Sequence, residues 1–226
     1  VVAFDGKSSA FGLNGKVVNT VFQTESGEFG HGFARAKAAS DGTLKFAGRL
    51  ADGSIWTGSA RVVKDEIQEL RCPVAIPLTT VKSLLHGDLI ISETESLVLQ
   101  SEVPMIWIRG ANAKSNVFPE GIEEFVNARG SIWAPPKSGS ILEDGLTNIN
   151  LTFGEALGAL KGIYTSSNRV VFAEAPKGFS FKVTKSTGGF TGKFIPQGGA
   201  SSKALTYYGL LFNPALEDIS ANELPM

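Results

Sequence analysis

Apolar and polar residues alternate with a period of two along most of the chain, and glycine-containing turns interrupt the alternation. Such a pattern is typical of β-strands that bury one face. Residues 120–128 fit either a short helix or a strand that runs on to 130–133, and we favour the strand because the rest of the chain is β-patterned. The other predicted strands cover 16–22, 29–38, 43–50, 54–63, 73–78, 84–91, 98–100, 104–109, 148–153, 159–164, 169–173, 179–184, 189–195 and 204–212.

One hairpin pattern occurs twice. Phe46, Gly48 and Leu50 alternate with other residues, and Phe190, Gly192 and Phe194 repeat this spacing 144 residues further along. Each copy follows a glycine turn and precedes a strand that carries aromatic residues. We interpret the copies as corresponding hairpins in the two halves of one sheet system.

Glycines inside the predicted strands bear on the fold class. Gly48, Gly58, Gly192 and Gly209 stand where a strongly coiled sheet needs to bend. We therefore expect an all-β fold of antiparallel hairpins that form a closed or partly open barrel. A two-sheet β-sandwich is the alternative, in which the same glycines would be ordinary bulges.

The pattern also predicts the domain organisation. Residues 1–212 are expected to form a single all-β domain, and 213–226, with two prolines and acidic residues, an extended strap or linker. The stretch 110–145 holds several prolines and glycines and is expected to be rich in loops.

Composition narrows the function classes. Of the 226 residues, 21 are basic and 22 acidic. The chain therefore lacks the excess of basic residues that is typical of nucleic-acid-binding proteins. No run approaches the roughly 20 apolar residues of a membrane helix. The single cysteine, Cys72, excludes an intrachain disulfide and a cysteine-based zinc site. Val1 is not a natural start, so the chain is interpreted as a processed product or an excised segment.

Candidate catalytic and metal-binding residues are few. Cys72 with His31 or His86 could form a nucleophile and its base, but each is expected to have a structural role. Acidic pairs such as Glu93 and Glu95 lack the spacing of a calcium loop, although a calcium ion at some loop stays open. No cofactor is expected.

Three aromatic residues are the candidate contacts for a ligand or partner: Trp56, Trp133 and Tyr207. Trp56 and Trp133 stand near turns, where an exposed ring could stack on a sugar. Trp107 lies in a nearly all-apolar run and is expected in the core. A carbohydrate-binding module with an aromatic platform is therefore the alternative function.

Eight short motifs follow one another along the chain, at 30–32, 46–53, 73–78, 82–89, 107–109, 130–136, 148–152 and 187–194. In their order the chain resembles a β-rich domain, without settled function, that recurs in large secreted or cell-surface bacterial repeat proteins. The resemblance implies a secreted or cell-surface location and a structural or interaction role, and it supplies no catalytic residues.

These observations lead to one expectation. The chain is predicted to be a non-enzymatic structural or interaction module of a secreted or cell-surface bacterial assembly. It would contact neighbouring domains or subunits through strand edges and the 110–145 region. Carbohydrate is the alternative partner, and neither nucleic acid nor a membrane span is expected.

Overall fold

A computed structural model describes residues 2–3, 13–27, 30–64, 69–78, 82–92, 98–114, 118–141, 147–152, 159–165, 167–196 and 203–211. Every regular element in these residues is a β-strand, and all pairing is antiparallel. The strands are β1 (Val2–Ala3), β2 (Val17–Thr24), β3 (His31–Ala38), β4 (Thr43–Arg49), β5 (Ile55–Arg61), β6 (Val63–Lys64), β7 (Leu70–Leu78), β8 (Ser83–Ile91), β9 (Leu99–Ser101), β10 (Met105–Arg109), β11 (Ile122–Trp133), β12 (Thr147–Thr152), β13 (Ala159–Tyr164), β14 (Val170–Phe172), β15 (Ser180–Thr184), β16 (Gly189–Phe194) and β17 (Leu205–Leu210).

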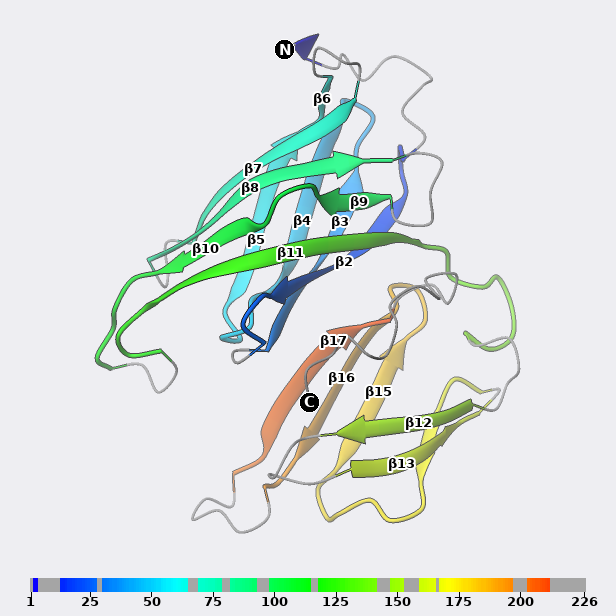
Figure 1. Ribbon diagram of the computed structural model, residues 1–226. Helices are drawn as coiled ribbons and strands as arrows, with labels where there is room; N and C mark the ends of the chain where they lie inside the picture. Colours follow the sequence, from blue (N-terminus) through cyan, green and yellow to red (C-terminus); the bar gives the residue numbers. More distant parts are fainter. Residues whose placement is uncertain are drawn as a thin grey trace. The chain divides into compact units, whose positions relative to one another are not determined.

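The largest sheet has eleven strands in the order β1-β6-β7-β8-β10-β11-β2-β3-β4-β5. Short β9 pairs with β8 and β11, the same two neighbours that β10 has. Strands β9 and β10 therefore act as one strand interrupted at Glu102, Val103 and Pro104. Figure 1 shows β11, in green, running along the whole sheet between these strands and β2.

This sheet curves back on itself. Strand β5, the last in the order, packs against β7, and a Cβ atom added to Gly58 would lie 2.5 Å from Cδ1 of Ile76. Because Gly58 has no side chain, the two strands approach closely. The result is a partly closed ring, and the prediction of an all-β fold built from antiparallel strands is confirmed.

The alternation seen in the sequence builds the core. In β7 the buried residues are Cys72, Val74, Ile76 and Leu78, and the residues between them are exposed. Burying one face of each strand in this way removes apolar surface from water at about 25 cal/mol per Å². Turns between the strands use left-handed glycines, such as Gly53 with φ 78° between β4 and β5.

The two copies of the hairpin pattern lie in different sheets. The first forms β4 and β5 of the eleven-stranded sheet, and the second forms β16 and β17 of a three-stranded sheet. The interpretation that they are halves of one sheet system is therefore wrong. Periodicity identifies a hairpin but carries no information on which sheet it joins.

Both copies pair aromatic residues with glycines on the neighbouring strand. Phe46 lies opposite Gly58 and Gly48 opposite Trp56, just as Phe190 lies opposite Gly209 and Gly192 opposite Tyr207. The glycines are sterically required, since an added Cβ would lie 1.9 Å from the Phe33 carbonyl oxygen at Gly48 and 2.1 Å from the Ser180 carbonyl oxygen at Gly192.

A buried ion pair joins two of the sequence motifs. Arg109 Nη1, at the end of β10, lies 3.1 Å from Asp52 Oδ2 in the turn between β4 and β5, and the two side chains are 6% and 1% exposed. Asp52 Oδ1 also accepts a hydrogen bond of 2.9 Å from the Ser54 main-chain N–H. The Arg109 guanidinium stands 5.7 Å from the centre of the Phe118 ring. The contact fixes the turn against the central strands.

Contacts divide the chain into two compact units, one of which covers the described residues up to Trp133 and the other Ala134–Leu211. The second unit contains two sheets, β12-β13-β14 and β15-β16-β17. Half-buried aromatic rings cluster in this unit: the ring centres of Phe172 and Phe179 lie 4.9 Å apart, and those of Phe181 and Phe190 5.4 Å. Whether 1–212 behave as a single domain stays a prediction, and the expected strap at 213–226 lies outside the described residues.

Candidate functional site

The tryptophans proposed as ligand contacts are buried. Trp56 is 2% exposed and packs edge-on to Phe22 and stacked with Phe46, at centroid distances of 5.6 and 6.0 Å. Trp133, at the end of β11, is 8% exposed. Trp107 is 1% exposed, and its Nε1 donates a 2.8 Å hydrogen bond to Ser83 Oγ. None of the three indole rings therefore presents a face on which a sugar could stack.

Tyr207, the third candidate contact, is half-buried. Its ring lies over Gly192, and its hydroxyl donates a 2.7 Å hydrogen bond to the Ser180 carbonyl oxygen on β15, so it bridges the whole three-stranded sheet. Burial raises the pKa of Tyr207 to about 12. These contacts give the residue a structural task, and its role in partner contact stays a prediction.

The residues considered for nucleophilic chemistry lie in unfavourable surroundings. Cys72 is fully buried in β7, and burial together with the charge of Asp88 raises the pKa of its thiol to about 12. A reactive cysteine needs the opposite shift. Partial desolvation lowers the pKa of His31, which is exposed at the start of β3, and His86 Nδ1 lies 3.1 Å from the Val74 carbonyl oxygen.

The described residues contain neither a cluster of metal-ligating side chains nor a membrane-spanning helix. Within them, no three His, Cys, Asp or Glu side chains converge in a way that could hold a metal ion. Glu93 and Glu95 lie outside those ranges. Searching the same residues finds no helix with the length and apolarity needed to cross a membrane.

An exposed apolar surface lies on the outer face of the first unit. Cross-strand register places Leu84 beside Ile108, and Ile106 between His86 and Phe125. Leu84, Ile108 and Phe125 are 36%, 40% and 50% exposed. Exposed Ala75 and Pro77 on β7 extend these two rows, since they lie opposite His86 and Leu84. We call this surface the outer patch: Ala75, Pro77, Leu84, His86, Ile106, Ile108 and Phe125.

Sequence reasoning missed the outer patch for an identifiable reason. In Met105–Arg109 every second residue is buried, but Ile106 and Ile108 on the opposite face are apolar too. An all-apolar run indicates a strand covered on both faces, but in β10 the face that carries Ile106 and Ile108 is uncovered. The signal was present in the run itself, which lacks polar outer residues such as Arg35 and Lys37 on β3.

The predicted contact region at 110–145 contains more regular structure than expected. Its centre forms β11, the longest strand, which pairs with β10, β9 and β2. The preference for a strand over a helix is thereby confirmed, and the expectation of a loop-rich stretch holds only on either side of it. Residues 111–114 are exposed, while 115–117 and 142–146 lie outside the described residues.

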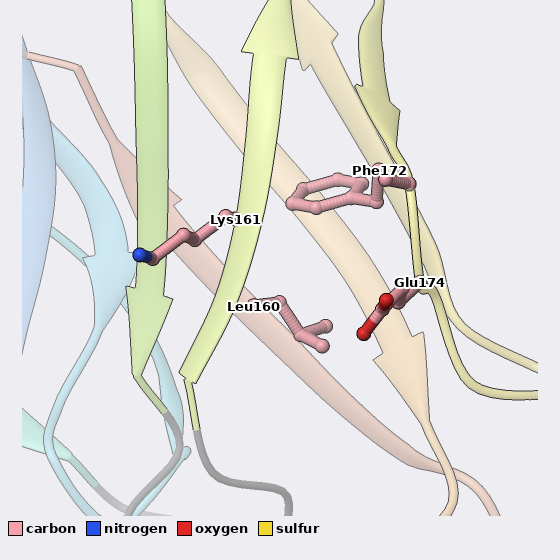
Figure 2. Close-up of a pocket in the computed structure, with 5 residues that line it drawn as sticks. Leu160, Lys161, Phe172 and Glu174 are labelled. Atoms are coloured by element: carbon pink, nitrogen blue, oxygen red, sulfur yellow. The ribbon is translucent and has the colours of Figure 1, made fainter.

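The second unit has two hollows, and the Phe172 ring lines both of them. A cavity of about 440 Å³ is lined by Leu160 and Lys161 of β13 and by Phe172, Ala173 and Glu174. Figure 2 shows Leu160, Phe172 and Glu174 pointing toward one another, and Lys161 pointing away from them. A groove of about 620 Å³ lies between β14 and β15, and Phe172 lines it as well. Both volumes lie in the range of ligand sites, about 300–1,000 Å³.

Comparison with known proteins adds no relative, because no family model, curated protein or solved structure matches the chain. The resemblance to the bacterial surface domain therefore stays a prediction.

Proposed function

We propose that the chain is a non-enzymatic interaction module that contacts a neighbouring domain or subunit of a larger assembly. The supporting observation is the outer patch, in which three large apolar side chains on adjacent strands are between 36% and 50% exposed. Contiguous exposed apolar surface of this kind marks interaction sites in soluble proteins. A secreted or cell-surface setting belongs to the proposal and rests on the motif resemblance.

The surroundings of the outer patch suit contact with protein. Two acidic residues lie at the end of the two rows: Glu123 opposite Ile108, and Glu25, whose main-chain N–H donates a 2.9 Å hydrogen bond to the Phe125 carbonyl oxygen. Apolar side chains at the centre with charge at the rim are typical of protein interfaces. The carbohydrate alternative loses its support, because the indole rings of Trp56 and Trp133, which would form the platform, are buried.

A photo-cross-linking residue in place of Phe125 tests the proposal, in the cell that makes the protein. We expect a discrete cross-linked product at this position. The matched control places the same group at Lys45, an exposed position on β4 away from the outer patch. If Phe125 gives no more product than Lys45, and the purified chain does not self-associate at its highest soluble concentration, the proposal is wrong.

A further inference from the structure

The edge of β14 is open for another strand. β14 pairs with β13, and no other described strand pairs with it. The Thr165 N–H donates a 2.8 Å hydrogen bond to the Arg169 carbonyl oxygen, which makes these residues a hydrogen-bonded pair of the hairpin. Because such pairs alternate along antiparallel strands, Val171 turns its main-chain groups toward β13. Val170 and Phe172 therefore direct their N–H and C=O groups outward.

The groove beside this edge is mostly apolar. Phe172, Phe179 and Phe181 line it together with Val170 and Val171, and Val171 is 58% exposed. The Phe172 ring meets those of Phe179 and Phe181 at centroid distances of 4.9 and 6.2 Å, so the wall is a packed aromatic surface. An extended segment in the groove could bury every second side chain against it.

One charge stands at the groove, and it is positive. Arg169 is the single charged residue among the described residues that line it. In the described part of the chain, the Arg169 guanidinium forms no ion pair, although its main chain is held by Thr165. Basic residues also outnumber acidic ones by eight to four in Ala134–Leu211. A guanidinium binds a carboxylate through two parallel hydrogen bonds.

We propose that this groove binds an extended acidic segment of a partner protein, which adds as a strand to the edge of β14. Main-chain groups of Val170 and Phe172 pair with the segment, alternate apolar side chains cover the aromatic wall, and an Asp or Glu side chain binds Arg169. Strand addition of this kind takes affinity from the main chain and specificity from side-chain pockets. The inference rests on the proposed function, since both make the chain a binding module.

A displayed library of random peptides of about ten residues, selected on the whole chain, tests the inference. Enriched peptides should carry Asp or Glu next to β-branched or aromatic residues. We expect Arg169→Glu to weaken their binding by at least about tenfold, because it replaces attraction by repulsion, and Arg169→Lys to keep part of it. The matched control is Lys114→Glu, which changes an exposed cation of the first unit and should leave binding unchanged.

Amide exchange measured by NMR on the complex tests the strand addition itself. The amides of Val170 and Phe172 should become protected, while the amide of Val171, already directed toward β13, should not change. No enriched peptide, equal binding to Arg169→Glu, or unchanged exchange at Val170 and Phe172 would each overturn the inference. Replacing Phe125 in the outer patch should leave peptide binding intact, so the two proposals fail separately.

Discussion

Removing one charge from the buried pair of Asp52 and Arg109 should strongly destabilise the first unit. Asp52→Asn keeps the shape of the side chain and the Oδ1 atom that accepts from the Ser54 N–H. The variant leaves the Arg109 guanidinium without the carboxylate that lies 3.1 Å away in the native chain, and the Arg109 side chain is only 6% exposed. Breaking a buried pair in this way costs about 3–5 kcal/mol, so we expect the free energy of unfolding to fall by about 3 kcal/mol or more.

A double-mutant cycle separates the ion pair from other contacts of these residues. Combining Asp52→Asn with Arg109→Met removes both charges, and we expect the double variant to recover most of the stability that the single variants lose. The matched surface control is Glu102→Gln, because Glu102 Oε2 lies 2.9 Å from Arg71 Nη2 with a side chain 54% exposed. An exposed pair contributes at most about 1 kcal/mol.

Urea unfolding followed by tryptophan fluorescence measures these differences in the right part of the molecule. All three tryptophans lie in the first unit and are buried, so their emission should change when that unit unfolds. The reasoning is refuted if Asp52→Asn costs no more than Glu102→Gln, or if the cycle gives no coupling between Asp52 and Arg109.

Further predictions concern a glycine, a tyrosine and the cysteine. Gly192→Ala would place a Cβ 2.1 Å from the Ser180 carbonyl oxygen and 2.2 Å from the Tyr207 ring. We therefore expect overpacking to lower the free energy of unfolding by about 1–3 kcal/mol. Thermal unfolding measures this loss, and an unchanged melting temperature would contradict it. Burial raises the pKa of Tyr207 to about 12 in the folded state, whereas a tyrosine in the unfolded chain has a pKa of about 10. The stabilisation that the neutral hydroxyl provides is therefore present below about pH 10 and is lost as the pH rises toward 12. Ultraviolet titration should show this tyrosine ionising last, and in Gly192→Ala it should ionise at lower pH as the ring is displaced. Cys72, buried and with a pKa of about 12, should react with a thiol reagent only after unfolding, and fast labelling of the native chain at pH 8 would disprove its enclosure.

Local patterns predicted the strands well because each strand depends on its own alternation and turns. Gly42 and Gly53, which stand in glycine-containing turns on either side of β4, both adopt φ 78°. The segment that ends at Trp133 became one strand in spite of helix-like spacing, since its pairing with β2 and β10 outweighs local propensity.

Non-local features could not be predicted from a single sequence. Asp52 and Arg109 are far apart in the chain, and nothing local shows that they meet. Alternation likewise separates the two faces of a strand but does not say which face the sheet will bury. Trp56 was therefore a candidate for an exposed ring, and it lies in the core. One signal of the two compact units was present, since Pro135 and Pro136 lie just after Trp133, where the first unit ends. The strand pattern continues on both sides of these prolines and hid the boundary.

Hydroxyl-radical footprinting of the outer patch tests the central claim most directly. The chain is oxidised alone and within the assembly from which it comes, and modification of Phe125, 50% exposed in the chain, is compared by mass spectrometry. Trp107, 1% exposed, serves as the internal check that the fold is intact, because it should stay unmodified in both samples. If the outer patch is an interface, modification of Phe125 falls in the assembly. Equal modification of Phe125 in both samples would contradict the proposed function.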